Sequence, residues 1–320
     1  MSVKLFKASN FTYTPFGDFI NGDLDFLSEN GVEIGDSPSA SNIIISQNIK
    51  HLRKHLWRGF FGKSFLIWTN EPRFDTHFVK SKRIFFNLFR CHFMNIYTED
   101  VCVTNLSNIS SYKFINKNLK LLPSDFQLKN KRTIALMSYF KGVDSPPLMR
   151  ANVNIDLIAT RAKIAVEGHK LKRIDVFGKG WPDGISKEDS RYGNWKDRKQ
   201  ELLKTYAFNL CFENTVAKNY ITEKIWDSIE SYCLPIYFGE GTNIYDLFPE
   251  DSFIDYSKLN SPEALFKFID ELSNIEYVQR LNKCISVYNS ISLNGESIRK
   301  EERKKILIKI VEKVNFIQSS

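Results

Sequence analysis

Five polar or charged residues that could handle a phosphate gather in one short segment of this chain. They are Glu213, Asn214, Thr222, Glu223 and Lys224. An apolar run of strand length leads into the first two, and a helical pattern opens at Thr222. Thr222 is a good helix N-cap, the unpaired amides of a helix start favour an anion, and Lys224 would add a positive charge. The spacing therefore predicts a phosphate-handling turn, with an ordinary capped helix as the alternative.

The elements around this turn are those of a strand, helix and strand unit. A second strand is expected at residues 234–238. Polar groups at the end of the first strand are typical of nucleotide sites in α/β sheets. The helix residues expected to face the sheet are Ile225, Trp226 and Ile229, and those expected to face the solvent are Asp227, Ser228 and Glu230.

Three motifs in this segment resemble the donor-binding signature of the α-1,3/1,4-fucosyltransferases, in particular those of bacterial type. They are Phe208-Asn-Leu-Cys-Phe-Glu-Asn214, Tyr220-Ile-Thr-Glu-Lys-Ile-Trp-Asp227 and Leu234-Pro-Ile-Tyr-Phe-Gly239. The resemblance spans residues 206–239. It implies an α/β fold of the GT-B type, with two Rossmann-like domains, a cleft between them and GDP-fucose as the donor. No cofactor is then required, and a divalent metal is at most stimulatory.

The resemblance also implies a role for each candidate residue. Lys224 and Arg161 would hold the diphosphate, with Arg150 as the alternative to Arg161. Glu223 would bond the ribose hydroxyls. The other expected donor-site residues are Tyr220, Asn214, Thr222 and Glu213, of which Glu213 either touches the fucose ring or acts through its neighbours.

Glu71 is the candidate general base. It stands just past a buried-looking strand that ends at Trp68, in a loop restricted by Pro72. A carboxylate partly shielded by Trp68 and Phe74 would have a raised pKa and could accept the proton of an acceptor hydroxyl. The matching stretch of the family carries the proposed base. The alternative is a loop glutamate that caps a nearby helix.

The expected reaction is an inverting α-1,3- or α-1,4-fucosyl transfer. Fucose would move from GDP-β-L-fucose to a galactose- or N-acetylglucosamine-containing glycan, either lipopolysaccharide or an oligosaccharide, by base-assisted displacement. Two differences from the family pattern keep alternatives open: Asn219 replaces a common Gly, and Ser138-Tyr139 replaces Ser-Asn. The alternatives are a GT-B enzyme for another nucleotide sugar and a non-catalytic nucleotide-binding scaffold in glycan assembly.

Charge and composition restrict the partners. The net charge of +8 and the pI near 9.0 favour an anionic ligand. The basic residues are scattered, and no nucleic-acid-binding motif is present, so we expect no nucleic acid partner. Asp23-Leu-Asp25 has the form of a metal-binding Asp-x-Asp pair, but Asn21-Gly22 before it indicates a turn leading into a helix, and no metal site is expected.

The five cysteines form no CxxC pair and are expected to be reduced core residues. They are Cys91, Cys102, Cys211, Cys233 and Cys284.

Three parts are expected along the chain: an acceptor-side Rossmann-like domain at 1–128, a donor-binding Rossmann-like domain at 129–295, and a basic amphipathic helix at 296–320. A linker containing Pro123 separates the two domains. The predicted strands are 42–46, 64–68, 83–89 and 93–97 in the first domain, and 133–139 and 173–177 in the second. The predicted helices of the second domain include 154–168 and 198–204.

The expected cellular location of the protein depends on the terminal helix at 296–320. We favour a helix packed on the protein with a solvated basic face, and the alternative is contact with an anionic membrane. Nothing at the N-terminus resembles a signal peptide, and no apolar run approaches the ~20 residues needed to span a bilayer. The sequence therefore predicts a cytoplasmic protein, with peripheral attachment to the inner face of the membrane as the alternative.

Overall fold

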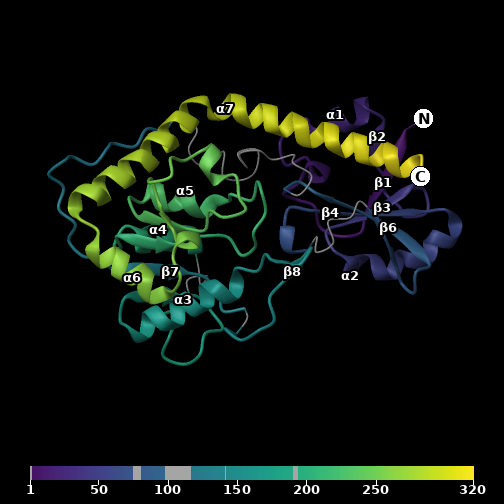
Figure 1. Cartoon of the computed structure of the whole chain (residues 1–320). Helices are drawn as coiled ribbons and strands as arrows, with labels where there is room; N and C mark the ends of the chain where they lie inside the picture. The colour runs from purple at the N-terminus through teal and green to yellow at the C-terminus, as the bar shows by residue number, and fades with distance from the viewer. Residues whose placement is uncertain (1, 75–80, 98–116, 141, 190–193) are drawn as a thin grey trace. The chain divides into compact units, whose positions relative to one another are not determined.

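The computed structural model describes residues 2–74, 81–97, 117–140, 142–189 and 194–320. The chain divides into two compact units (Figure 1). The first unit contains Met1–Val103 and Lys300–Ser320, and the second contains Thr104–Arg299. Each unit holds a largely parallel sheet with helices, and a long helix ends the chain, so the predicted α/β class of GT-B type is confirmed.

Six of the described strands form the sheet of the first unit, in the order β2-β1-β3-β4-β6-β5. All neighbours are parallel except β5 and β6. The strands are β1 (Val3–Lys7), β2 (Val32–Ile34), β3 (Ile43–Ser46), β4 (Ser64–Thr69), β5 (Ser81–Ile84) and β6 (Phe89–Asn95). The helical segments are η1 (Pro15–Gly17), α1 (Asp23–Glu29), α2 (Ile49–Leu52), η2 (Arg53–Phe61) and η3 (Pro72–Phe74).

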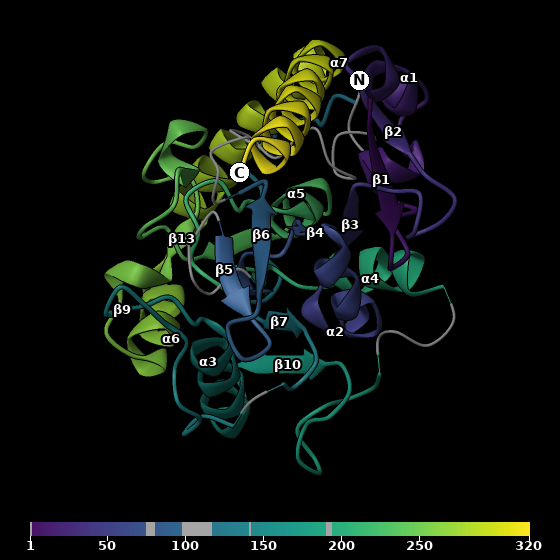
Figure 2. The same cartoon turned by 90° about the vertical axis from the view of Figure 1, so that its right-hand side faces the viewer.

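The strand predicted at 83–89 is wrong. Strand β5 ends at Ile84, residues 85–88 turn, and β6 begins at Phe89, so that β5 and β6 are adjacent antiparallel arrows in Figure 2. The apolar run suggested one strand, but Phe85 and Phe86 have left-handed backbone angles that end it.

The two faces of this first sheet have different coverings. Along β6, Cys91 and Phe93 belong to the apolar cluster that includes Leu52 and Leu56 of α2 and η2. His92 points the other way, because side chains alternate along a strand, and its ring lies 6.0 Å from that of Phe316. The end of the terminal helix therefore packs on the sheet face opposite to α2 and η2.

The terminal helix α7 (Asn274–Gln318) includes the predicted tail, 296–320, except its last two residues. In its last part the apolar side chains of Ile306, Ile310 and Val314 are buried, while Lys304 and Lys309 are exposed. This agrees with the favoured prediction of a helix packed on the protein. The segment expected as a separate third part belongs from Lys300 onward to the first unit. Among the described residues, none of the helices is long and apolar enough to cross a membrane.

Five of the described strands form an all-parallel sheet in the second unit, in the order β10-β7-β11-β12-β13. They are β7 (Thr133–Leu136), β10 (Ile174–Phe177), β11 (Phe208–Leu210), β12 (Leu234–Tyr237) and β13 (Ile254–Asp255). A small hairpin joins β8 (Met149–Arg150) and β9 (Val153–Asn154). The helical segments are α3 (Ile158–Lys170), α4 (Trp195–Leu203), α5 (Glu223–Glu230), η5 (Ile244–Asp246), η6 (Tyr256–Lys258) and α6 (Pro262–Glu271).

Residues 117–128 group with the second unit, although the first domain was expected to extend to residue 128. Side-chain amides of α7 hold this segment. Asn282 accepts from the N–H of Leu122 at 2.8 Å and donates to its carbonyl at 2.9 Å. Asn289 makes the same pair of bonds with Leu119, at 2.8 and 2.9 Å. These bonds satisfy backbone groups that no strand partner satisfies, which fixes the segment along the helix.

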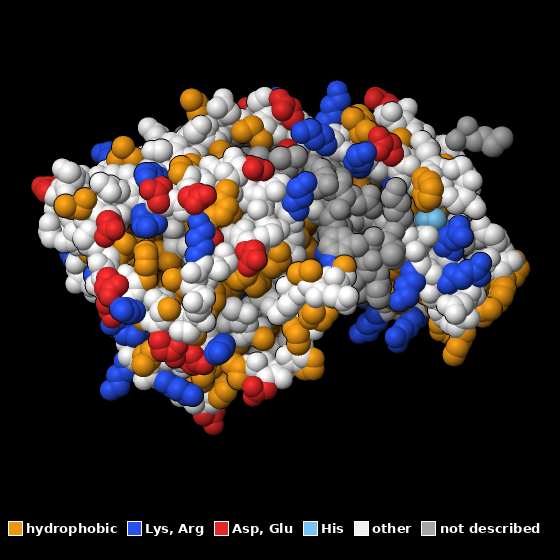
Figure 3. Space-filling model, in the orientation of Figure 1, with side chains coloured by type: hydrophobic (Ala, Val, Ile, Leu, Met, Phe, Trp, Pro, Cys, Tyr) orange, Lys and Arg blue, Asp and Glu red, His pale blue; other side chains and the backbone are white. Residues whose placement is uncertain are grey.

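Acidic and basic side chains mix over the face of the second unit seen on the left of Figure 3. On this face of the second unit the basic residues are scattered, as expected.

Candidate functional site

The candidate site lies where the strand order of the second sheet reverses. The chain passes from β7 to β10 on one side and then crosses to β11 on the other, so the reversal is between β7 and β11. Ligands of parallel α/β sheets bind beyond the carboxyl ends of the strands at such a point. A cavity of about 330 Å³ is found there, lined by Leu136, Met137, Ser138, Trp195, Lys199, Glu223 and Lys224.

The buried carboxylate of Glu213 organises the turn after β11. Its Oε1 accepts from the Thr222 N–H at 2.9 Å and from the Thr222 hydroxyl at 2.5 Å. Its Oε2 accepts from Lys224 Nζ at 2.7 Å. Lys224 Nζ also lies 2.7 Å from Thr222 Oγ1. Glu213 therefore joins the end of the strand to the start of helix α5.

Thr222 occupies the predicted N-cap position of α5, but its side chain does not cap the helix. The hydroxyl bonds Glu213 in place of the first-turn amides. The N-terminal end of α5 thus has no side-chain cap, which leaves the type of helix start that attracts an anion.

Lys224 and Glu223 are charged at neutral pH. Burial lowers the pKa of Lys224, but the carboxylates of Glu213 and Glu223 outweigh burial and hold this pKa above its ordinary value. Burial raises the pKa of Glu223, but Lys224 and then Lys199 outweigh burial and lower this pKa to about 2. The cavity wall therefore presents an ammonium group beside an ionised carboxylate.

Arg161 reaches the same place from helix α3. Its Nη1 donates to the carbonyl of Phe212 at 3.1 Å, directly before Glu213. Its positive charge lies near enough to Lys224 to oppose the protonation of that side chain, although the two carboxylates outweigh this effect and the pKa of Lys224 stays raised. Arg150, the alternative in the sequence, is buried at the end of β8.

Asn214 and Tyr220 both lie in the connection between β11 and α5. The Asn214 carbonyl accepts from the Leu157 N–H at 3.1 Å, which anchors the chain just before α3. Its side-chain Oδ1 is buried and has no hydrogen-bond partner among the described residues. The Tyr220 side chain is buried, and its carbonyl accepts from the Tyr237 hydroxyl at 3.4 Å.

The prediction that Asp227 and Ser228 face the solvent is wrong. Both are buried because they have partners: Lys199 Nζ lies 2.5 Å from Asp227, and Asn209 donates to the Ser228 hydroxyl at 2.7 Å. The Ser228 hydroxyl in turn donates to the Lys224 carbonyl at 2.9 Å. These bonds fix the first turn of α5 against α4 and β11.

Two lining residues of α4, Trp195 and Lys199, were not predicted from the sequence. Trp195 lies before the predicted helix start at 198, because α4 begins at Trp195. Lys199 lies within the predicted helix, but no local pattern marks it as a lining residue. Trp195 is 43% exposed, and Lys199 Nζ lies 6.0 Å from the centre of its ring system. A flat exposed ring beside an ionised pair is suited to an aromatic or sugar ring.

The end of β7 supplies the opposite wall. The Oγ of Ser138 is buried and has no hydrogen-bond partner within the described part of the chain. The neighbouring carbonyl of Met137 accepts from Trp181 Nε1 at 2.8 Å. Gly178 has φ +141°, and a Cβ there would lie 2.2 Å from that same carbonyl. Glycine at 178 is therefore required for the close approach of the turn after β10 to this wall.

Asn219, where the family commonly has Gly, is accommodated in the fold. Its backbone is not left-handed, and its Oδ1 accepts from Asn243 Nδ2 at 2.7 Å. Asn219 does not line the cavity beside Lys224.

Glu71 belongs to the first unit, directly after β4. Its N–H donates to Thr69 Oγ1 at 3.0 Å, and its side chain is half-buried. Trp68 is buried edge-on against Phe16, with ring centroids 5.5 Å apart. The expected position past a buried strand, before Pro72, is confirmed, and the role of general base remains a prediction.

Asp23 opens helix α1 after Gly22, as the turn interpretation predicts. Its carboxylate is buried and accepts two hydrogen bonds from the Arg303 guanidinium, one of them 2.9 Å long. The cation beside Asp23 is thus a side chain of α7.

The described cysteines are buried and unpaired, as predicted, and burial raises the pKa of Cys91 and of Cys211 to about 12. Cys102 lies outside the described residues.

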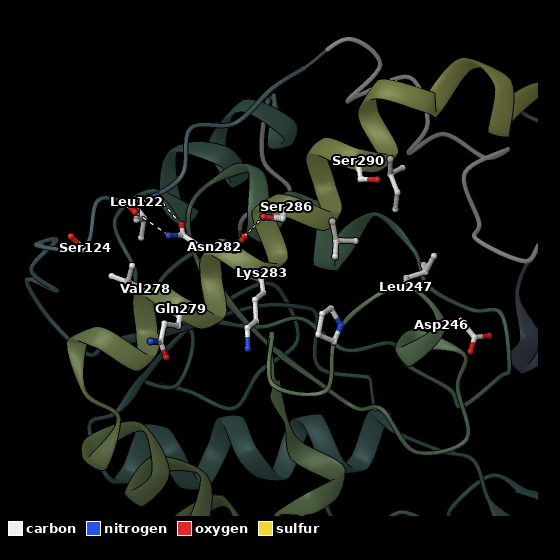
Figure 4. A pocket seen from close by; sticks show the side chains of 13 residues that line it. Leu122, Ser124, Asp246, Leu247, Val278, Gln279, Asn282, Lys283, Ser286 and Ser290 are labelled. Atoms are coloured by element: carbon white, nitrogen blue, oxygen red, sulfur yellow. Dashed lines mark hydrogen bonds between the residues drawn. The ribbon is translucent and has the colours of Figure 1, made fainter.

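A wider hollow of about 800 Å³ lies between α7, residues 122–124 and residues 246–249 (Figure 4). Two of its polar side chains are already engaged: Asn282 holds Leu122, and Lys283 pairs with Asp251 at 2.5 Å. None of the predicted site residues lines this hollow. We therefore place the functional site at the smaller cavity beside Lys224.

Known proteins similar to this chain identify its family. Residues 149–308, half of the 320, match the model of the C-terminal part of glycosyltransferase family 10, the fucosyltransferases. The chain belongs to this fucosyltransferase family. The matched residues include Arg161, Glu213 and Lys224 but not Glu71.

Curated fucosyltransferases are similar to this family member over shorter segments. An α-(1,4)-fucosyltransferase of Arabidopsis thaliana is 32% identical over 94 residues, which is 29% of this chain and 23% of the relative. A 3-galactosyl-N-acetylglucosaminide 4-α-L-fucosyltransferase of Pan troglodytes is 30% identical over 124 residues, which is 38% of this chain and 30% of the relative. The chain thus matches less than a third of the length of either relative.

Two solved structures resemble this fucosyltransferase-family chain more distantly. An α1,3-fucosyltransferase with GDP-fucose has a TM-score of 0.48 at 18% identity, over 88% of this chain and 81% of that one. The β-glucosyltransferase of phage T4 with UDP-glucose has a TM-score of 0.46 at 13% identity, over 96% of this chain and 99% of that one.

Proposed function

We propose that this chain is an inverting fucosyltransferase. It transfers fucose from GDP-β-L-fucose to a glycan that contains galactose or N-acetylglucosamine, in lipopolysaccharide or an oligosaccharide. Membership of the fucosyltransferase family supports the reaction class. The observation that carries the proposal is the linked set of Glu213, Thr222 and Lys224 at the reversal point of a parallel sheet.

The diphosphate binds at the start of α5. An ammonium group has three N–H donors, and Glu213 and Thr222 account for two of those of Lys224. The third N–H donates to a phosphate oxygen. The uncapped amides of the helix start also donate to the phosphate. Arg161 supplies the second cation for the charge that develops on the leaving GDP.

The ribose binds through Glu223. An ionised carboxylate accepts hydrogen bonds only, so the low pKa of Glu223 suits it to the two ribose hydroxyls. Glu213 acts through Thr222 and Lys224, whose positions it fixes. Asn214 and Tyr220 lie in the connection that leads to these residues and are proposed as further donor contacts.

The transfer itself is a single displacement. Glu71 takes the proton of the acceptor hydroxyl, the acceptor oxygen forms a bond to the anomeric carbon, and the bond from that carbon to the diphosphate breaks with its electron pair leaving on GDP. Attack opposite to the leaving group inverts a β-linked donor to an α-fucoside. Because Lys224 and Arg161 neutralise the leaving group, a divalent metal is at most stimulatory.

Nucleotide selectivity tests this proposal. In calorimetric titrations with EDTA present, GDP is expected to bind at least about tenfold more tightly than UDP or dTDP, because a site built for the guanine edge leaves polar groups unpaired with another base. Tighter binding of UDP would assign the chain to another nucleotide sugar. Loss of GDP binding in EDTA would contradict the metal-free assignment.

A further inference from the structure

The first unit carries a group of exposed apolar side chains that the proposed function does not use. They lie on η2 and on the turn between β5 and β6, and we call them the aromatic patch: Trp57, Phe60, Phe61, Phe85, Phe86 and Leu88. Phe86 is 90% exposed, and Phe60 and Phe61 are 71% and 70% exposed. Isolated exposed apolar residues are ordinary on a protein surface, but a group of them marks a site of interaction.

The two halves of the aromatic patch are joined. The ring of Phe60 packs edge-on against that of Phe89, with centroids 4.9 Å apart. Phe89 is the first residue of β6 and pairs with Ile84, at the base of the turn. A Cβ on Gly59 would lie 2.4 Å from the Phe89 ring, so glycine allows η2 to approach this closely. The turn and the end of η2 therefore form one surface.

The turn holds its phenylalanines in an unfavourable backbone conformation. Phe85, Phe86 and Asn87 have φ of 54°, 55° and 62°. Asparagine tolerates this region, but it costs other non-glycine residues about 1–2 kcal/mol each. Two strained phenylalanines, both exposed, indicate that the turn serves a contact and not the stability of the unit.

The charge around the aromatic patch has one sign. Residues 49–63 contain five Lys or Arg and no Asp or Glu: Lys50, Arg53, Lys54, Arg58 and Lys63. Lys82, opposite Cys91 in the register of β5 and β6, adds a sixth cation on the same sheet face, whereas Arg83 and Arg90 share the face of His92. The Arg58 guanidinium lies 4.4 Å from the centre of the Trp57 ring. Figure 3 shows orange and blue side chains together at its lower right edge, with no red among them in this view.

We propose that the aromatic patch binds the surface of an anionic lipid bilayer. Phe61 and Phe86 enter the headgroup region, where aromatic side chains are favoured, and the surrounding Lys and Arg side chains contact lipid phosphates. A second copy of this chain is a poor partner for the same surface, because two such cationic surfaces repel each other. This inference does not depend on the transfer activity.

We assign this contact to the aromatic patch and not to the terminal helix. Ile306, Ile310 and Val314 of that helix are buried in the first unit, and its exposed apolar side chains, Ile308 and Phe316, are 38% and 47% exposed, less than any member of the aromatic patch. The end of this helix also lies on the sheet face opposite to η2, because His92 of β6 faces Phe316 whereas Cys91 and Phe93 face η2. Its exposed lysines therefore provide a control surface within the same unit.

Flotation of the full chain with vesicles tests the proposal. We expect binding to vesicles of phosphatidylcholine mixed with phosphatidylglycerol and none to phosphatidylcholine alone. The double variant Phe61→Ser/Phe86→Asn is expected to bind at least about tenfold more weakly, since two aromatic side chains no longer leave water. Asparagine suits the left-handed backbone at 86, so the turn is retained.

Two control variants separate the alternatives. Leu293→Ser/Ile275→Ser removes two exposed apolar side chains from the second unit, and Lys304→Glu/Lys305→Glu/Lys309→Glu reverses the exposed charges of α7. Both are expected to bind the mixed vesicles within about threefold of the unchanged chain. Absence of binding by the unchanged chain, or equal binding by the Phe61/Phe86 variant, would overturn the proposal. So would an equal loss in either control, or a Phe61/Phe86 effect on self-association alone.

Discussion

Replacement of Lys224 by methionine is expected to weaken GDP binding by roughly 10- to 150-fold, which corresponds to about 1.5–3 kcal/mol. In the proposed site the ammonium group makes a charge-assisted bond to the diphosphate, and methionine keeps the length of the side chain but makes no such bond. Calorimetric titration with GDP measures the effect. Lys170→Met, an exposed lysine of the same unit, is the matched control and should leave GDP affinity unchanged.

The partners of Lys224 require a second comparison. Without Lys224, the buried carboxylate of Glu213 keeps its bonds to Thr222 but loses its cationic partner, so the single variant also loses stability in thermal unfolding. The double variant Glu213→Gln/Lys224→Met removes both charges together and should recover part of that stability. If Lys224 contacts the diphosphate, GDP affinity stays low in the double variant. Recovery of GDP affinity there would make Lys224 a structural residue.

Replacement of Glu71 by alanine is expected to lower kcat by about 10²- to 10⁴-fold. In the proposed mechanism the acceptor hydroxyl then has no base, whereas the residues proposed to hold GDP belong to the second unit and are unchanged. GDP affinity is therefore expected to stay within about twofold of that of the unchanged chain. Transfer kinetics with GDP-fucose and GDP titration together measure the two effects.

Glu71→Gln and Glu29→Ala complete this test. Glutamine keeps the size of the side chain but cannot take a proton, so Glu71→Gln should lose the acid limb of the kcat profile against pH. Glu29, an exposed acid of the same unit, should be replaceable without effect. An equal loss of GDP binding and activity in Glu71→Ala would show a structural role, and an unchanged kcat would assign the base elsewhere.

The segment around the site could be predicted because its signals are local. The apolar runs at β11 and β12 and the N-cap at Thr222 each depend on a few neighbouring residues, and they lie where predicted. The Thr222 hydroxyl bonds Glu213 because a buried carboxylate nine residues earlier competes with the helix amides. Trp195 and Lys199 come to the cavity through the packing of α4, which no local pattern records.

The errors on the remaining elements have the same physical origin. Asp227 and Ser228 are polar and were expected on the solvated side of α5, yet Lys199 and Asn209 make their burial favourable. The apolar run near Phe86 was expected to be a strand because its composition favours one, but it turns and exposes its side chains. For α5, partners outside the local window decided the structure, whereas at Phe86 a turn interrupts the apolar run.

Transfer of labelled fucose from GDP-fucose to an array of galactose- and N-acetylglucosamine-containing acceptors tests the central claim most directly. The account predicts an α-linked fucoside on at least one acceptor, with one GDP released for each fucose transferred, and no product from UDP- or dTDP-sugars. A folded chain that binds GDP but yields no fucoside with any acceptor would contradict it, as would a product formed from a UDP-sugar in place of GDP-fucose.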